Sequence, residues 1–223
     1  MKLSSLKVGV DVPWVTGWSG EPGLGVGPCP SVGGALAILQ ADHPGRGKPL
    51  YSENHAVRQR LSVRDMLCPM CGQPTTADDR WTQVAHPVTA GRLRAAARGD
   101  GLPRDLADDR VLIDAGAIAP LHRACVDRSL RYCSHLKADP NIDVRRFPER
   151  WIVLPLLARA EAPAQLFLAR PVPQRTVPVI GFLQLGGLAE DRDLDRADPG
   201  NGHDSAPQVS LRGALGVDET NPS

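Results

Sequence analysis

Apolar residues recur at steps of three and four in the second half of the chain, between residues 120 and 137. This spacing places them on one face of a helix, and Pro120 suits the first turn of that helix. Residues 53–67 also have helical spacing, and residues 91–97 have the composition of a short basic helix. The pattern therefore predicts three helices, of which 120–137 is the clearest.

Short apolar runs bounded by turn residues predict strands elsewhere in the chain. Residues 81–84 and 111–113 form two such runs. Three more follow one another near the C-terminal end, at 151–158, 164–170 and 177–185. Their close succession predicts a small β-meander.

Glycine and proline are abundant in the chain, and aromatic residues are scarce. The 223 residues include 22 Gly and 21 Pro but only 3 Phe, 2 Tyr and 4 Trp. Gly and Pro together make up about 12% of an average chain, so this composition predicts a loop-rich fold. The core must be built from Leu, Val, Ile and Ala, and a metal site would matter for its stability.

The formal charge is unevenly distributed. The whole chain carries +1, but residues 190–223 contain eight acidic and three basic residues and so carry −5. The remaining residues carry +6. A basic body with an acidic tail is compatible with nucleic-acid binding. An ordinary solvated surface with a disordered acidic end explains the same distribution.

Four residues with metal-binding side chains occur as two pairs. Cys68 and Cys71, followed by Gly72, have the spacing of a zinc knuckle, in which a tight turn brings two thiolates together. His122 and Cys125 are three residues apart, which places both side chains on one face of the first helical turn. Together the two pairs predict a tetrahedral structural Zn²⁺ site with no position for water or substrate.

Two alternatives to this ligand set remain open on the sequence. Cys133 or His135 could replace His122, or the residues could bind no metal. Cys125 and Cys133 are eight residues apart, which is about 12 Å along a continuous helix, whereas thiolates on one zinc lie about 4 Å apart. The spacing therefore favours His122 unless the helix is broken.

The chain contains five cysteines and no long apolar segment. An odd number of cysteines with a Cys-x-x-Cys pair is typical of a reducing compartment and not of a disulfide framework. The N-terminal residues lack the apolar core of a signal peptide, and no stretch is long enough for a membrane span. We therefore expect a soluble, cytoplasmic protein that does not interact with a membrane.

Three stretches carry a family resemblance: VPWVTGWSGE (12–21), HAVRQR (55–60) leading into LCPMCG (67–72), and PLHRAC (120–125) followed by YCSHL (132–136). They are similar to small zinc-finger proteins of actinobacteria and their phages. Those proteins commonly read V-P-[YFW]-x-x-x-W-S-x-E, then R-Q-R-R before C-x-V-C-G, then [CH]-x-x-C with C-P-H-L behind it. Ser134 stands where that pattern has Pro, and His122 stands where many members have Cys. The resemblance covers about residues 12–157 and supports the same zinc ligands, but it adds little about activity.

These features together predict an α+β fold, namely a small, loop-rich, zinc-stabilised domain with a treble-clef-like arrangement. In that arrangement a knuckle precedes a helix whose first turn carries the second ligand pair. We expect a Gly/Pro-rich N-terminal arm with short strands (1–50) and a zinc-binding unit with a long insert (51–140). A β-meander packed on this unit (141–188) and an acidic disordered tail (189–223) would follow.

For function, the sequence favours a non-enzymatic binding module. Six arginines next to the ligand pairs could contact the phosphates of duplex nucleic acid: Arg58, Arg60, Arg64, Arg123, Arg128 and Arg131. A protein partner explains the same features about equally well, and no small-molecule substrate is indicated.

Two other functions remain as alternatives. One is a phage-type structural or assembly protein, whose N-terminal arm and acidic tail would become ordered against partners. The other is an HNH-type metal-dependent nuclease, for which His86 is the only histidine in a suitable interval. His86 has no preceding Asp, however, and no suitable Asn follows before Asn141.

Overall fold

The computed structural model describes residues 2–96, 101–139, 142–158 and 178–190. Its regular elements in chain order are β1 (Thr16–Trp18), β2 (Gly23–Pro28), the 3₁₀ turn η1 (Pro30–Val32), β3 (Leu36–Gln40), β4 (Pro49–Asn54), α1 (Ala56–Arg64), β5 (Trp81–Thr82), β6 (His86–Thr89), α2 (Ala90–Ala95), β7 (Val111–Asp114), α3 (Arg123–Tyr132), α4 (Ser134–Ala138), β8 (Arg145–Arg146), β9 (Trp151–Ala158) and β10 (Val179–Leu188). The fold belongs to the expected α+β class, with short helices and several sheets. None of the helices in these ranges is long and apolar enough to cross a membrane.

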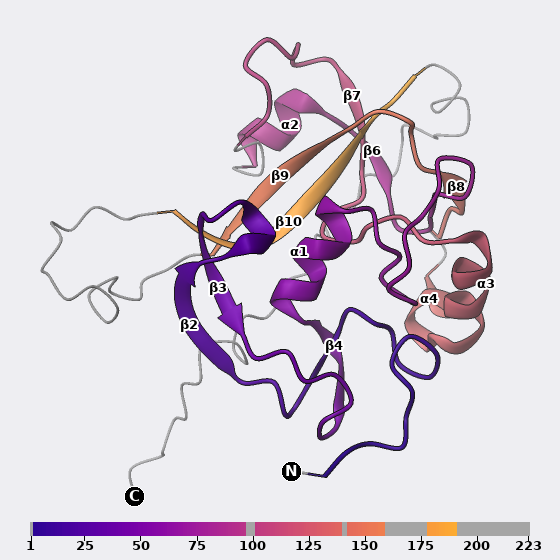
Figure 1. The fold of residues 1–223 in the computed structure, drawn as a ribbon. Helices are drawn as coiled ribbons and strands as arrows, with labels where there is room; N and C mark the ends of the chain where they lie inside the picture. Colours follow the sequence, from indigo (N-terminus) through magenta and orange to yellow (C-terminus); the bar gives the residue numbers. More distant parts are fainter. Residues whose placement is uncertain (1, 97–100, 140–141, 159–177, 191–223) are drawn as a thin grey trace, which may run out of the picture.

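A six-stranded sheet forms the centre of the molecule (Figure 1). Its strand order is β2-β3-β10-β7-β6, and β9 pairs with β10. The central strand β10 runs parallel to β3 at Ile180, and it runs antiparallel to β7 and to β9. Almost every residue of β10 is buried, as is typical of an apolar strand that is covered on both faces.

The position of β10 differs from the architecture expected from the sequence. β9 and β10 do form an antiparallel pair, but β10 also joins β3 of the N-terminal arm to β7 of the 51–140 segment. The pairing of β3 with β10 connects positions far apart in the chain, so the local pattern does not signal it. Strands from the three segments expected at 1–50, 51–140 and 141–188 thus share one sheet. The expected strand at 164–170 and residues 191–223 of the acidic tail lie outside the described residues.

Helix α1 packs against this sheet and connects it to the predicted ligands. Its Gln59 side chain donates to the Leu183 carbonyl of β10 at 2.7 Å and accepts from the Leu183 N–H at 3.0 Å. Val63 of the same helix is buried against Ile113 of β7 and Leu185 of β10. The helix ends shortly before the Cys-x-x-Cys turn, so the main core determines where the first ligand pair lies.

The second ligand pair lies on a smaller outer part of the fold, where β5 pairs with β8. The sequence predicts one helix over 120–137, but the structure has two, α3 and α4. They are separated at Cys133, whose backbone is extended (φ −85°, ψ 111°) and so cannot continue a helix. In Figure 1 this pair of helices stands beside the sheet, on the side away from β2 and β3.

Candidate metal centre

Cys68, Cys71, His122 and Cys125 come together at one point. Their ligand atoms, three Sγ atoms and one imidazole nitrogen, all lie within 4.8 Å of one another. Three thiolates and one imidazole make up a donor set of structural zinc sites, which hold sulfur at about 2.3 Å and nitrogen at about 2.0 Å from the ion. The four residues expected from the sequence are therefore close enough to bind one metal ion.

The first ligand pair is positioned by a tight turn that requires glycine. The Cys68 N–H donates to the Gln73 carbonyl at 2.8 Å, and the Gly72 N–H donates to the Cys68 carbonyl at 2.8 Å. Gly72 has a φ of 76°, in the left-handed region that side chains disfavour. A Cβ at Gly72 would lie 2.8 Å from the Trp14 ring. Both the backbone conformation and the contact with Trp14 therefore exclude a larger residue.

The N-terminal segment holds this turn from outside. The Trp14 N–H donates to the Met70 carbonyl at 2.9 Å, and the Val15 N–H donates to the Pro69 carbonyl at 3.0 Å. Trp14 was not among the expected site residues. In the sequence, Trp14 is marked only by lying in stretch 12–21, one of the three that carry the family resemblance. The first part of the chain is thus packed against the candidate metal centre and is not a loose arm.

The second ligand pair begins α3. His122 is the N-cap residue of this helix, and Cys125 lies in its first turn. The Asp79 carboxylate accepts from the Arg123 N–H at 2.8 Å and so satisfies one of the free N–H groups of the helix start. Trp81 and Leu121 exchange two backbone hydrogen bonds of 2.9 and 2.8 Å, which fixes the residue before His122.

Hydrogen bonding selects the histidine nitrogen that faces the other ligands. His122 Nε2 lies 3.1 Å from the Pro74 carbonyl, which can only accept, so the ring carries its proton there. In the neutral ring His122 Nδ1 then carries no proton, and it lies 3.4 Å from Cys71 Sγ. A ring N–H donated to a backbone carbonyl is the usual support of a metal-binding histidine, so this geometry fits a metal ligand.

Burial and the neighbouring thiolates raise the pKa of two of the thiols, Cys125 and Cys68, when no cation is close. Burial, together with the charges of Cys68 and Cys71, raises the pKa of the Cys125 thiol to about 12. Burial likewise raises the pKa of Cys68 above its ordinary value. A bound metal ion removes this penalty because it deprotonates coordinating thiols directly. The cluster thus favours a cation that binds thiolates.

Cys133 and His135 do not belong to the cluster. Because the helix is broken at Cys133, the distance along a continuous helix no longer excludes this cysteine as a ligand. The group of four potential ligands nevertheless contains neither Cys133 nor His135. Cys133 is half-buried and His135 is exposed. The ligand set with His122 is therefore the one that the structure brings together.

The prediction that Arg58 and Arg60 bind nucleic acid is wrong. Both side chains are buried, at 1% and 0% exposure. They point into the fold because α1 lies between the sheet and the N-terminal segment. Helical spacing alone did not show this, since arginine is normally a surface residue.

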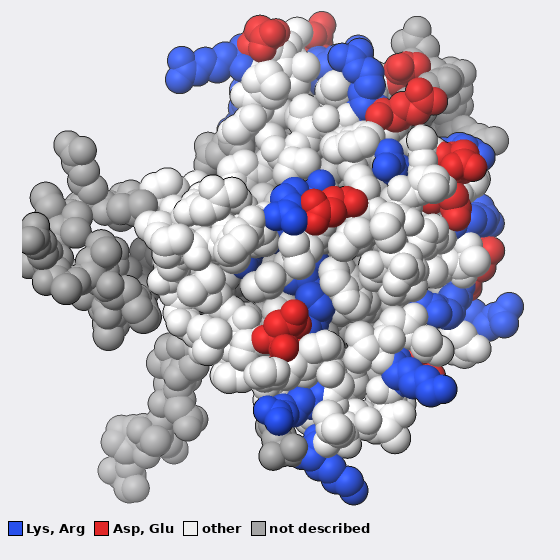
Figure 2. All heavy atoms as spheres, viewed as in Figure 1, with Lys and Arg blue, Asp and Glu red and all other residues white. Residues whose placement is uncertain are grey.

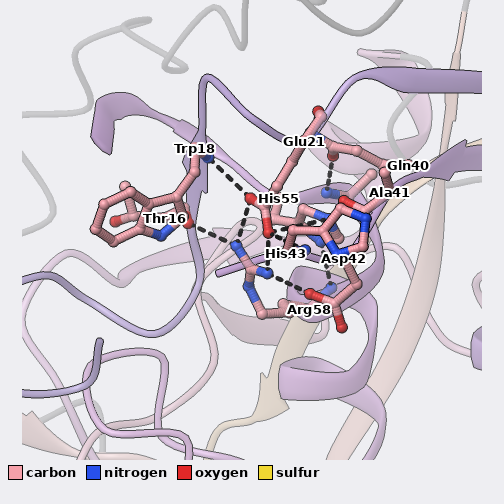
Figure 3. A network of polar contacts seen from close by, with 10 residues as sticks. Thr16, Trp18, Glu21, Gln40, Ala41, Asp42, His43, His55 and Arg58 are labelled. Carbon is pink, nitrogen blue, oxygen red and sulfur yellow. Dashed lines mark hydrogen bonds and ion pairs between the residues drawn. The ribbon is translucent and has the colours of Figure 1, made fainter. Parts of the chain in front are cut away.

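Arg58 lies in a buried ion-pair network (Figure 3). Its guanidinium contacts both carboxylate oxygens of Glu21, at 2.6 and 2.9 Å, and also the carboxylate of Asp42. Glu21 further accepts the backbone N–H groups of Trp18 at 2.8 Å and His43 at 2.9 Å. The carboxylate is thus fully satisfied by internal donors, which gives Glu21 and Arg58 a structural role.

Glu21, Asp42 and His55 form a second group of potential metal ligands. The Arg58 guanidinium already occupies the carboxylates of this group. His55 Nε2 bonds to the Ala41 carbonyl at 2.9 Å, and His55 Nδ1 accepts from the Arg58 N–H at 3.2 Å. Burial and the charge of Arg58 lower the pKa of His55. With both ring nitrogens and both carboxylates engaged, this group is not suited to a cation.

The other four predicted arginines lie nearer the surface, but they do not form a continuous basic patch. Arg64 pairs with Asp65 at 2.6 Å, and Arg123 pairs with Asp127 at 3.2 Å. Arg128 is half-buried and donates to a backbone carbonyl, whereas Arg131 is exposed. On the face shown in Figure 2, acidic and basic side chains are interspersed.

His86, the residue on which a nuclease would depend, begins β6 and is exposed. It belongs to neither of the two groups of potential metal ligands found among the described residues. Within those ranges, His86 is therefore not part of a cluster of three or more potential metal ligands.

Comparisons of the chain with protein-family models, curated proteins and solved structures found no significant match. The resemblance to small zinc-finger proteins of actinobacteria and their phages therefore stays a prediction. The assignment of a metal centre depends on the geometry and chemistry of the four ligand residues.

Proposed function

We propose that the chain is a non-enzymatic binding module in which a structural Zn²⁺ is held by Cys68, Cys71, His122 and Cys125. The observation that carries this proposal is the closed Cys₃His donor set, since four protein ligands fill the tetrahedron that zinc prefers. No coordination position then remains for a substrate or a reactive water.

The order of the ligands along the chain supports a treble-clef-like arrangement. A Cys-x-x-Cys turn comes first, short strands follow, and a helix begins with the second pair. In this arrangement the metal links the turn after α1 to the start of α3. The role of the metal is then to fix the orientation of α3 relative to the main sheet.

The outer face of α3 and α4 is the surface that we propose for the partner. Only Cys125, Val126 and Ser129 of α3 are buried, and no residue of α4 is. Tyr132, at the end of α3, is 75% exposed. An aromatic side chain on a rigidly held helix is a common anchor in protein interfaces.

Mixed charge on this face favours a protein partner over duplex nucleic acid. Arg123 and Asp127 form an ion pair one turn apart, and two of the six arginines expected to contact phosphate are buried. A duplex carries a dense negative charge that is recognised mainly by unpaired Lys and Arg. A protein surface can match alternating charges and an exposed tyrosine together.

The test begins with the polypeptides and nucleic acids that co-purify with the zinc-loaded chain, followed by titration of the purified partner. We expect Tyr132→Ala to weaken binding at least tenfold without loss of zinc, as for an interface hot spot. The matched control is Tyr51→Ala, because Tyr51 is 64% exposed on β4. Equal effects of the two variants would contradict the proposed surface. Binding to duplex DNA or RNA with a log–log salt slope of about −3 to −5 would show that nucleic acid is the partner.

A further inference from the structure

A positive charge is buried in the core beside a cysteine. Arg60 of α1 is 0% exposed, and a guanidinium stays protonated in proteins. Its Nη1 donates to the Gly181 carbonyl of β10 at 2.7 Å, and its Nη2 donates to the Ile38 carbonyl of β3 at 2.8 Å. Within the described residues Arg60 makes no ion pair with a carboxylate. Because an unpaired buried charge is strongly destabilising, a counter-ion is needed.

Cys29 is the group positioned to supply that counter-ion. It is 3% exposed, and its Sγ lies 3.5 Å from Arg60 Nη2. Arg60 Nε donates to Ser31 Oγ at 2.8 Å, so the hydroxyl hydrogen of Ser31 is free to point to Cys29 Sγ, which is 3.1 Å away. The sulfur thus faces a guanidinium N–H and a hydroxyl that can both donate, which is the environment of a thiolate.

Among the residues that the structure describes, the charged groups that face Cys29 are positive. From α1 both Arg60 and Arg64 face it, and Arg64 donates to the Pro30 carbonyl at 2.9 Å. Asp65, the C-cap residue of α1, is paired with Arg64 at 2.6 Å. From β3 and β10, the groups that contact the Arg60 guanidinium are the backbone carbonyls of Ile38 and Gly181. Burial alone would raise the pKa of the Cys29 thiol, but the Ser31 hydrogen bonds and the charge of Arg60 outweigh it and lower the pKa below 9.0.

We propose that Cys29 is a thiolate in the folded protein and the counter-ion of Arg60, so that this buried pair makes the fold responsive to modification of one cysteine. The pair ties the loop at residues 28–34 to α1, β3 and β10. Alkylation by iodoacetamide forms a carbon–sulfur bond, releases iodide and removes the negative charge. The alkylated, uncharged sulfur then leaves Arg60 without a counter-ion. This inference is independent of the proposed binding function.

The first test measures the charge of Cys29 directly. In a pH titration of the ultraviolet thiolate absorbance, the zinc-loaded wild type should show one more cysteine ionised below pH 9.0 than Cys29→Ser shows. Cys133→Ser controls for the loss of a cysteine outside both the pair and the metal ligands. The Cβ chemical shift of Cys29 in isotope-labelled wild type reports the same ionisation without requiring a variant to fold. A protonated Cys29 in that measurement overturns the proposal.

The second test uses the dependence of stability on pH. Because the folded-state pKa of Cys29 is depressed, the pair stabilises the fold fully above pH 9.0 and loses this effect as the pH falls through the folded-state pKa. The unfolding equilibrium constant of Cys29→Ser relative to wild type should therefore rise with pH, by up to about tenfold per unit in that window. Contributions of the zinc ligands cancel in this ratio. A ratio that does not change with pH overturns the proposal.

Discussion

Removal of the metal should loosen the region around α3 and leave the main sheet folded. A separate hydrophobic cluster lies beneath α3, and its two fully aliphatic buried members are Leu121 and Val126. Burial of such a side chain contributes about 1.5–3 kcal/mol, whereas structural zinc in small domains contributes about 10–16 kcal/mol. The metal is thus the larger contribution in this region. The sheet keeps three clusters of its own, which contain no ligand residue.

Hydrogen exchange with and without a chelator measures this difference, after elemental analysis has verified the loss of zinc. Peptides from α3 should exchange at least a hundredfold faster in the metal-free protein, while peptides from β7 and β10 keep their protection. His122→Ala should reproduce the effect of the chelator at low free zinc. The reasoning is refuted if α3 stays protected after the metal is lost, or if His122→Ala binds zinc as tightly as the wild type.

Two further predictions concern the contacts that position the metal centre. Glu21→Gln should lower the free energy of unfolding by about 3–5 kcal/mol, because it removes one partner of a buried ion pair. The control is Asp42→Asn, which should cost less than about 1 kcal/mol because the Asp42 side chain is 54% exposed. Denaturant titration checks both values, and equal costs would contradict the assignment. Gly72→Ala should destabilise the knuckle by about 1–3 kcal/mol because of its positive φ. When Gly72→Ala is made in a chain that already carries Trp14→Ala, its cost should be smaller but should not vanish. A cost that vanishes would show that the contact with the ring, and not the backbone, excludes a side chain.

The sequence was sufficient to predict the cluster of four potential metal ligands, because both pairs are defined by local spacing. A turn at Cys68–Cys71 and a helix start at His122–Cys125 each bring two ligands together before tertiary contacts are considered. The separation of α3 from α4 at Cys133 was missed, since the apolar stripe continues across the break. Periodicity reports which face is apolar, but it does not report backbone geometry at one residue.

The same reasoning failed for Arg58 and Arg60, whose partners are distant in the chain. Glu21 pairs with Arg58 across 37 positions, and Cys29 meets Arg60 across 31. Nothing local to α1 indicates that these charges are buried.

Three consecutive polar residues in α1 explain how an aromatic-poor chain holds the candidate metal centre in place. Arg58 bonds to Glu21 of the N-terminal segment, Gln59 bonds to the backbone of β10, and Arg60 bonds to the backbones of β3 and β10. Hydrogen bonds of this kind are directional, and each is costly to break when the partner is buried. They fix the rotation of α1 about its own axis, which sparse aliphatic contacts do not do. Because Cys68 follows α1 after a short turn, the candidate metal centre takes its position from these bonds, and with a metal bound the orientation of α3 would depend on them in turn.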